Sequence, residues 1–506
     1  MPNFYINKKK TKSLNYIFST YQDIKIPNSS LPDLILESYQ NDKERIFHVN
    51  GVTHKEYTGE MMHNLIIKFA KCLNDLGFRK GDVIGIILPS VIEYHYIINA
   101  ILLIGCIASP ISPDSKPEDI KNTIANLHPK CLITYSNVAQ GKIKQLKNLL
   151  PTLNDIIVID EEEEGVSLNL QKLIHQSNGK YIKVEFDQKK DIAIVPFSSG
   201  TSGLHKGVLL SHFNLVANVL QGIECEKRFY EKDSVFLGCT PFFHIYGLTM
   251  LVLLPVISKV KTIVIPRFNL QIFLELIQRY KATMAYVVPP VIVMLGKSKI
   301  VNDYDLSSLK VLFSGSAPLS NLVEQSINER FQGKIKIKQA YGLTETSPIA
   351  MVNPSDNIKV GSAGKLVSNM IAKVISIEDK SILGVREVGE ICLAGPNIMI
   401  GYHNNQEATK NTIDSEGFLH TGDIGYVDED GYFYITDRIK ELIKVKGYQV
   451  PPAELEGVLM KNSEILDCCV IGIDDFEHGE LPRAYVVKKE NSTLTEKDIH
   501  SYRIEN

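Results

Sequence analysis

The sequence has no ladder of closely spaced cysteines. Its 8 cysteines are scattered along the chain, and the only close pair is Cys468 and Cys469. No CxxC pair and no metal-ligand spacing occur among them. This pattern predicts reduced thiols in an intracellular compartment, with no disulfide bonds and no metal–thiolate site.

An excess of charge of one sign is also missing. The chain carries 55 basic and 58 acidic residues, for a net charge of -3. A basic excess is the usual signature of a protein that binds nucleic acid or an anionic membrane surface. The composition therefore predicts neither a nucleic-acid partner nor a membrane-surface partner.

The chain lacks an uninterrupted apolar run of membrane-spanning length. A spanning helix needs about 20 consecutive, mainly apolar residues. The most apolar stretch, Val83 to Ile111, is broken by Pro89, Glu93 and Asn99 among others. We therefore predict no integral membrane segment and interpret this stretch as a buried strand followed by a helix.

Residues 1–29 are predicted to form a flexible N-terminal arm. The first 22 residues contain Lys8, Lys9, Lys10 and Lys12 and no acidic residue, a bias that a mitochondrial presequence would share. The alternative, a solvated disordered arm, is favoured because the arm has lysine rather than arginine and no clear apolar face. Cytoplasm is the default expectation for location.

The remaining chain is too long for one compact core, since it has 506 residues of which 44% are hydrophobic. From about Ser30 to Ala193, helical stretches such as Tyr57 to Leu76 alternate with short apolar runs such as Val83 to Leu88, which is typical of βαβ units. The same rhythm recurs between Gly238 and Pro290. After Asp356 short β runs dominate, including a pair joined by Asp430-Gly431.

These patterns predict an α/β protein. Its large N-terminal body, residues 30–437, would contain two α/β subdomains and a β subdomain. A small mobile α+β C-terminal domain would follow at residues 438–506. The boundary is placed at the charged segment Asp437-Arg438-Ile439-Lys440-Glu441.

A Ser/Gly-rich segment follows the apolar strand Ile192 to Phe197. It has four hydroxyl residues, three glycines and a lysine, in the order Ser198, Ser199, Gly200, Thr201, Ser202, Gly203, Leu204, His205, Lys206 and Gly207. Backbone N–H groups and hydroxyls in such a loop can donate to phosphate oxygens, and the lysine adds a mobile positive charge. The loop does not match GxxxxGK[ST]. The alternative interpretation is a flexible turn without a ligand.

Further motifs occur downstream in a fixed order. They are Pro241-Phe242-Phe243-His244-Ile245-Tyr246-Gly247, Ser314-Gly315-Ser316-Ala317-Pro318-Leu319, Gln339-Ala340-Tyr341-Gly342-Leu343-Thr344-Glu345, Thr421-Gly422-Asp423, and the segment from Asp437 to Gln449. With the Ser/Gly loop, this series resembles the adenylate-forming superfamily of acyl-CoA synthetases, peptide-synthetase adenylation domains and beetle luciferases. The motif residues are most similar to those of 4-coumarate–CoA ligases and luciferase-like acyl-CoA ligases. The resemblance covers about residues 30–487.

The resemblance implies a carboxylic acid, ATP, Mg²⁺ and coenzyme A as substrates and cofactors. The acid would attack the α-phosphorus of ATP to give an acyl adenylate, which the CoA thiol would then convert to a thioester. The implied ATP/AMP residues are Ser198, Ser199, Gly200, Thr201, Ser202, Gly203, Lys206, Ala317, Gln339, Ala340, Tyr341, Thr344, Asp423, Arg438, Lys440, Lys444 and Gln449. Glu345 and Thr344 would hold Mg²⁺, and Asp423 would hold the ribose.

The resemblance also implies an acyl pocket and a moving C-terminal domain. His244, Tyr246 and Gly342 would contact the acyl group, with His244 as a gate; the alternative for His244 is a buried histidine bound to a backbone carbonyl. Lys440 occupies the hinge position. Lys444 and Gln449 would face the adenylate after rotation, and the implied CoA residues are Arg267, Lys446 and Gly447.

The chain departs from the family pattern at two places. Relatives end in a Ser-Gly-Lys segment whose lysine serves adenylation, whereas this chain stops at Asn506, so we expect an incomplete C-terminal domain and slow adenylation. His205 stands where relatives usually have proline, which predicts weaker ATP binding. The alternatives are a nucleotide-binding pseudoenzyme and a luciferase-like oxidase.

The substrate expected is a hydroxycinnamate, another aryl acid or a fatty acid. A peroxisomal location stays open if the true C-terminus lies downstream of Asn506. The sequence leaves the oligomeric state open.

Overall fold

A computed structural model describes residues 15–138, 144–161, 167–198, 205–231, 233–319, 321–446, 448–462, 464–475, 478–490 and 492–501. The chain divides into two compact units. Unit 1 consists mainly of Phe18–Ile371 and Ala394–Gly417, and unit 2 mainly of Ala372–Leu393 and Phe418–Asn506. A large N-terminal body and a smaller C-terminal unit agree with the predicted fold class. The predicted boundary between residues 437 and 438 stays a prediction.

The first sheet of unit 1 is largely parallel at its centre. Its strand order is β10-β11-β9-β5-β4-β6-β7-β8, and β21 pairs with β11. The strands are β4 (Val83–Ile87), β5 (Ile107–Pro110), β6 (Cys131–Thr134), β7 (Asp155–Val158), β8 (Leu168–Asn169), β9 (Ile192–Ile194), β10 (Phe197–Ser198), β11 (Lys206–Ser211) and β21 (Gly401–Tyr402). Every residue of β4 is buried, as expected for a strand covered on both faces.

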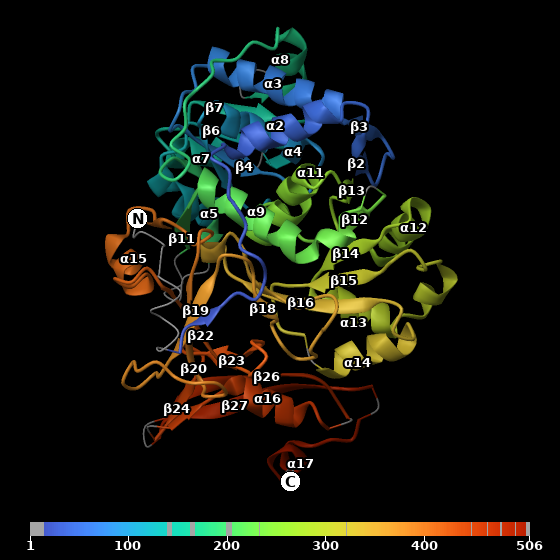
Figure 1. The fold of residues 1–506 in the computed structure, drawn as a ribbon, viewed down its shortest axis with the longest axis vertical. Helices are drawn as coiled ribbons and strands as arrows, with labels where there is room; N and C mark the ends of the chain where they lie inside the picture. Colours follow the sequence, from blue (N-terminus) through green and yellow to red (C-terminus); the bar gives the residue numbers. More distant parts are fainter. Residues whose placement is uncertain are drawn as a thin grey trace. The chain divides into compact units, whose positions relative to one another are not determined.

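Three helices of this half pack against one another: α2 (Leu31–Asn41), α3 (Gly59–Asp75) and α4 (Glu93–Leu103) (Figure 1). The predicted helix from Tyr57 begins later, because Glu56–Thr58 forms the short strand β3 and Thr58 caps α3 by accepting a hydrogen bond from the Met61 N–H. The strand-then-helix interpretation of Val83 to Ile111 is confirmed by β4 and α4.

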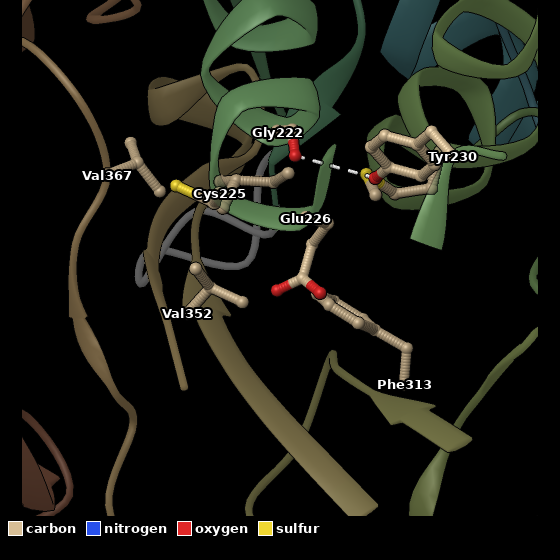
Figure 2. A pocket seen from close by; sticks show the side chains of 9 residues that line it. Gly222, Cys225, Glu226, Tyr230, Phe313, Val352 and Val367 are labelled. Carbon is tan, nitrogen blue, oxygen red and sulfur yellow. Dashed lines mark hydrogen bonds between the residues drawn. The ribbon is translucent and has the colours of Figure 1, made fainter. Parts of the chain in front are cut away.

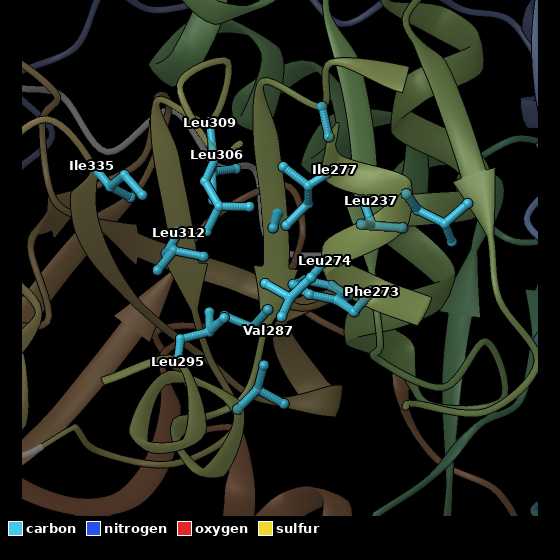
Figure 3. Close-up of a cluster of buried hydrophobic side chains, with 14 of the residues drawn as sticks. Leu237, Phe273, Leu274, Ile277, Val287, Leu295, Leu306, Leu309, Leu312 and Ile335 are labelled. Atoms are coloured by element: carbon cyan, nitrogen blue, oxygen red, sulfur yellow. The ribbon is translucent and has the colours of Figure 1, made fainter. Parts of the chain in front are cut away.

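The second sheet of unit 1 has the order β18-β17-β16-β15-β14-β12-β13-β2-β3. Its strands are β2 (Ile46–Asn50), β3 (Glu56–Thr58), β12 (Val235–Gly238), β13 (Lys261–Val264), β14 (Met284–Val287), β15 (Val311–Ser314), β16 (Lys336–Gly342), β17 (Ile349–Val352) and β18 (Lys365–Leu366). Buried side chains from this sheet and from α12 (Leu270–Tyr280) form one apolar cluster, which includes Leu237, Phe273, Ile277 and Val287 (Figure 3).

The strands β12 to β16 of this sheet are parallel, so their carboxyl ends meet at one edge. The register places Gly238 beside Tyr286, Val287 beside Ser314, and Ser314 beside Gln339. The motif segments that follow β12, β15 and β16 therefore leave the sheet at the same edge. In open α/β sheets, ligands usually bind outside the carboxyl ends of the strands.

Unit 2 contains two β-sheets. The first is a five-stranded sheet, β1-β19-β20-β22-β23, formed by β1 (Ile17–Phe18), β19 (Ile371–Ile375), β20 (Gly389–Ala394), β22 (Leu419–Val427) and β23 (Phe433–Arg438). The turn between β22 and β23 contains Gly431, with a φ of 82°, as the Asp-Gly pair predicts.

The second sheet of unit 2 has the strand order β25-β24-β27-β26. Its strands are β24 (Ile443–Val445), β25 (Tyr448–Val450), β26 (Ile465–Asp475) and β27 (Gly479–Lys488). Helix α16 (Pro452–Leu459) packs against β26, and the buried cluster there contains Ile443, Leu459, Ile465 and Val470. Among the described residues of the chain, no helix is long and apolar enough to cross a membrane.

Candidate functional site

The Ser/Gly-rich segment connects the two strands of a hairpin in unit 1. Strands β10 and β11 pair antiparallel, with Ser198 opposite Lys206. The candidate phosphate ligands Ser199, Gly200, Thr201, Ser202 and Gly203 lie outside the described residues. The hairpin places Ser198 and Lys206 at the two ends of the loop, and phosphate binding by the loop stays a prediction.

Lys206, Tyr402 and Glu345 come together beside this hairpin. The ammonium of Lys206 lies 4.8 Å from the centre of the Tyr402 ring. The Tyr402 hydroxyl donates a hydrogen bond of 2.8 Å to Oε1 of Glu345. Burial raises the pKa of Tyr402 above its ordinary value, and the Glu345 carboxylate raises it further, so the phenol stays protonated as a donor.

The backbone supports this arrangement from both sides. Strand β21 pairs with β11, so that Tyr402 lies opposite Val208. The Met399 N–H donates to the Glu345 carbonyl at 2.9 Å. Tyr402 was not predicted as a site residue, because it lies 57 positions from Glu345 and no motif of the series contains it. The sequence feature that could have drawn attention to Tyr402 is the pair Gly401-Tyr402, which polar residues follow.

Glu345 and Thr344 belong to the 3₁₀ turn η6 (Thr344–Thr346), which follows β16. Both side chains are half-buried. The Leu343 N–H donates to the Thr346 hydroxyl at 2.8 Å, which fixes the start of the turn. Within the described residues, the only hydrogen bond to the Glu345 carboxylate is at Oε1, so Oε2 is available for a cation.

The candidate adenine residues lie at the ends of β15 and β16. Ala340 and Tyr341 are half-buried, whereas Ala317 is exposed. The side-chain amide of Gln339 makes two hydrogen bonds within the protein. Its Oε1 accepts from the Leu319 N–H at 3.1 Å, and its Nε2 donates to Glu324 at 3.2 Å. Gln339 thus ties the loop that carries Ala317 to β16.

His244 does not match the alternative of a buried, carbonyl-bound histidine. Its side chain is exposed, and Nδ1 accepts a hydrogen bond of 3.3 Å from the Tyr246 N–H at the start of α10 (Ile245–Gly247). Acceptance at Nδ1 places the ring proton on Nε2 in the neutral form. Partial desolvation lowers the pKa of His244, which favours that neutral form.

Tyr246 is buried behind His244, and its hydroxyl donates to the Phe313 carbonyl at 3.0 Å. Its ring packs on Gly315, where an added Cβ would lie 3.1 Å from Tyr246 Cζ. Gly342 is more restricted, because an added Cβ would lie 1.9 Å from the Pro348 carbonyl oxygen. Tyr246 and Gly342 therefore occupy sterically restricted positions, whereas His244 is exposed; all three lie near the same sheet edge.

A small cavity lies among α9 (His212–Glu226), β15 and β17 (Figure 2). Its lining is mostly apolar and consists of Gly222, Cys225, Glu226, Tyr230, Met250, Phe313, Ile349, Val352 and Val367. The Tyr230 hydroxyl donates to the Gly222 carbonyl at 3.4 Å. Sequence reasoning missed this cavity because its walls come from five separate segments of the chain.

Glu226, in the cavity wall, forms a buried ion pair with Lys338 of β16. Ser355 joins both groups, since it accepts from Lys338 Nζ at 2.7 Å and donates to Glu226 Oε2 at 2.9 Å. Burial raises the pKa of Glu226 and lowers that of Lys338, and the mutual attraction opposes both shifts. Lys338 directly precedes Gln339, so this network anchors the strand that carries the adenine candidates.

The CoA candidate Arg267 follows β13 in unit 1 and is exposed. In unit 2, Lys440, Lys444 and Lys446 are exposed as well. The Lys444 N–H donates to Glu480, and Gln449 lies opposite Lys444 in the β24–β25 pair. Gly447 lies outside the described residues.

Asp423 and Arg438 form an ion pair within unit 2. They are opposite each other in the β22–β23 pair, and Arg438 Nε lies 2.9 Å from Asp423 Oδ1. The Asp423 side chain is 3% exposed, whereas that of Arg438 is 52% exposed. The Asp423 N–H donates to Thr421 Oγ1 at 3.0 Å, which fixes the turn before the carboxylate. The two residues predicted to act together are thus in direct contact.

Comparisons with known proteins identify the family of this chain. The chain matches the AMP-binding enzymes over residues 36–403 and the AMP-binding enzyme C-terminal domain over residues 454–503. A probable 4-coumarate–CoA ligase 1 from Dictyostelium discoideum is 46% identical over 503 residues, which cover 97% of this chain and 91% of that protein. The 4-coumarate–CoA ligase 3 of Arabidopsis thaliana is 37% identical, with coverage of 96% and 87%.

Solved structures share the fold. A long-chain-fatty-acid–CoA ligase from Archaeoglobus fulgidus has a TM-score of 0.77 at 28% identity and covers 96% of both chains. ATP-bound MatB from Rhodopseudomonas palustris has a TM-score of 0.85 at 23% identity, covering 93% of this chain and 91% of that chain. The chain belongs to the AMP-binding enzymes of the adenylate-forming superfamily, and within them it is a 4-coumarate–CoA ligase-like acid–thiol ligase.

Proposed function

We propose that this ligase activates an aryl acid, such as a hydroxycinnamate, or a fatty acid, with ATP and then transfers the acyl group to coenzyme A. The observation that carries the proposal is the contact of Lys206, Tyr402 and Glu345 beside the phosphate hairpin. It places one cation and one carboxylate next to the end of a Ser/Gly loop. A triphosphate and its counter-ion need that combination of charges.

In the first half-reaction, a carboxylate oxygen of the acid attacks the α-phosphorus of ATP and pyrophosphate leaves in line. Lys206 neutralises phosphate charge, and Ala317, Ala340 and Tyr341 bind the base. In unit 2, Asp423 and Arg438 hold the ribose, since one carboxylate can accept from two ribose hydroxyls. Gln339 acts indirectly, by fixing the loop of Ala317.

Mg²⁺ fits the residues at the end of β16. Oε1 of Glu345 accepts a hydrogen bond from Tyr402, Oε2 would bind the ion, and Thr344 adds a hydroxyl one residue away. Mg²⁺ is usually held by one or two carboxylates together with substrate phosphates and water. When bound, it supplies charge neutralisation on the phosphates. Tyr402 fixes the carboxylate before the ligand arrives.

The acyl group is proposed to enter beside His244, Tyr246 and Gly342. The Nε2–H of neutral His244 can donate to the acyl carboxylate without adding a second positive charge. The Tyr246 ring is buried, so an aromatic or aliphatic acid would pack beside it better than a strongly polar one.

The thioester step is assigned to unit 2 and to Arg267. After rotation of the C-terminal domain about Lys440 as the hinge, Lys444 and Gln449 would face the adenylate, and Lys446 and Gly447 would contact CoA. Arg267 would bind CoA phosphates. All these positions follow the family pattern residue by residue.

The test is acid-dependent pyrophosphate release from the full chain with ATP and a panel of hydroxycinnamic, benzoic and fatty acids. Asp423→Asn should raise the KM for ATP about 10-fold or more, because a charged hydrogen bond to the sugar is lost. Asp474→Asn, an exposed carboxylate in unit 2, is the matched control. If none of the acids raises the rate of pyrophosphate release above the rate measured without acid, the proposal is contradicted.

A further inference from the structure

Three side chains with metal-binding atoms meet on one face of the five-stranded sheet of unit 2. Glu390 and Cys392 are two residues apart on β20, so they point to the same face. His420 on β22 lies directly opposite Cys392 in the register. No substrate role was assigned above to any of the three.

The distances between the donor atoms suit a single metal ion. Cys392 Sγ lies 3.6 Å from His420 Nδ1, and His420 Nδ1 lies 3.1 Å from Glu390 Oε2. All three donor atoms lie within 4.8 Å of one another. Zinc bonds of about 2.3 Å to sulfur and about 2.0–2.2 Å to nitrogen or oxygen put tetrahedral ligands about 3.4–3.6 Å apart. Small side-chain rotations therefore suffice to share one centre.

The surroundings orient the ligands and leave an opening. Glu390 is 5% exposed and Cys392 is fully buried, whereas the His420 side chain is 25% exposed. The Gly422 N–H donates to Glu390 Oε1 at 3.3 Å, which leaves Oε2 toward His420. Such outer contacts orient metal ligands in known sites. Because His420 is the most exposed of the three side chains, we expect a metal ion to enter from its side, with a water as the fourth ligand.

One cation already lies near the cluster. Lys380 Nζ is 3.7 Å from Glu390 Oε2, but its side chain is 59% exposed. A long exposed lysine gains little from one such contact and can turn to solvent. Lys380 would therefore compete only weakly for Glu390 Oε2 with a metal ion that is bound by all three side chains.

We propose that Glu390, Cys392 and His420 bind one zinc ion, or another divalent transition metal that accepts thiolate, imidazole and carboxylate together. The Cys392 S–H bond breaks on binding, the sulfur bonds to the metal, and the proton goes to solvent. This proposal reverses the prediction of no metal–thiolate site. That prediction depended on spacing along the chain, whereas these ligands meet through strand pairing.

The test uses the full chain, treated with chelator and titrated with Co²⁺ in the absence of ATP and Mg²⁺. One Co²⁺ per chain should bind and produce a sulfur-to-cobalt charge-transfer absorption. Cys392→Ser should abolish this absorption. Glu390→Gln and His420→Ala should each weaken binding about 10-fold or more. Zn²⁺ should displace the cobalt.

Cys469→Ser and His478→Ala are matched controls in the same unit, and both should bind as the wild type does. Circular dichroism shows whether each variant is folded; if Cys392→Ser does not fold, Glu390→Gln and His420→Ala decide. The proposal is overturned if the wild type shows no sulfur-to-cobalt absorption. It is also overturned if the folded Cys392→Ser variant keeps this absorption, or if Glu390→Gln and His420→Ala both bind Co²⁺ with the wild-type affinity. The cobalt titration does not measure adenylation. A failure of the proposed ligase reaction would therefore not affect the result of the metal test.

Discussion

The Tyr402 hydroxyl donates a 2.8 Å hydrogen bond to Glu345 Oε1, and this contact joins strand β21 to the turn η6, two elements of unit 1 that are distant in sequence. The same tyrosine ring lies under the Lys206 ammonium. One side chain therefore positions both the proposed Mg²⁺ ligand and the proposed phosphate-binding lysine.

Tyr402→Phe should raise the KM for MgATP and lower adenylation, because Glu345 loses its orienting donor while the ring under Lys206 remains. A lost hydrogen bond to a charged group corresponds to about 1.5–3 kcal/mol, or about 10-fold to 100-fold in kcat/KM. Pyrophosphate release at varied MgATP measures it. Tyr304→Phe, at a half-buried tyrosine elsewhere in unit 1, is the control. Equal kcat/KM for Tyr402→Phe and wild type would show that Tyr402 does not position Glu345.

Gly342→Ala should destabilise unit 1, because the new Cβ would lie 1.9 Å from the Pro348 carbonyl oxygen. Forced overpacking of this kind typically costs about 1–3 kcal/mol. Thermal denaturation followed by circular dichroism measures the loss. Gly457→Ala in α16 is the control, because nothing lies within 4 Å of its added Cβ and alanine favours a helix. A melting temperature for Gly342→Ala equal to the wild type would refute the steric argument.

Lys338→Met should destabilise the protein strongly, because it leaves the Glu226 carboxylate buried without its partner. Removal of one member of a buried ion pair typically costs about 3–5 kcal/mol. The double variant Glu226→Gln with Lys338→Met should recover much of this loss, since no charge stays buried alone. Chemical denaturation of the two single variants and the double variant measures the coupling. A double variant less stable than both singles would contradict this account.

The adenylation rate should fall on acidification only below pH about 6.5, which is the ordinary pKa of a histidine, and we call this fall the acid limb. The reason is that partial desolvation lowers the pKa of His244. His244 then stays neutral as pH falls through the range in which a histidine with the ordinary pKa takes up a proton. His244→Asn keeps an acceptor for the Tyr246 N–H and should remove this limb. The readout is kcat/KM for the acid as a function of pH, with exposed His175→Asn as control. An acid limb that survives His244→Asn would assign the titration to another group.

Much of the architecture was predictable from local patterns. The apolar run at Val83 predicted β4, because strands buried on both faces are nearly continuous apolar segments. The pair Asp430-Gly431 predicted a hairpin, because the left-handed conformation at Gly431 costs glycine little. Motif order predicted Glu345, Asp423 and His244 as site candidates.

Other features needed the packed chain. Tyr402 was missed because only the pairing of β21 with β11 brings it to Glu345. The loop-anchoring hydrogen bonds of Gln339 to Leu319 and Glu324 were not predicted, and its contact with the base stays a prediction. Neither contact is encoded in spacing along the chain.

The sequence by itself determined which segments become strands and helices and which order of motifs marks the family, because burial periodicity and turn chemistry act over a few neighbouring residues. The tertiary structure alone decided which distant side chains share a hydrogen bond or a possible metal ion, as Tyr402 with Glu345 and Cys392 with His420 illustrate. The physical reason is that strand register depends on the packing of the whole unit, and a shift of one residue would turn either side chain to the opposite face.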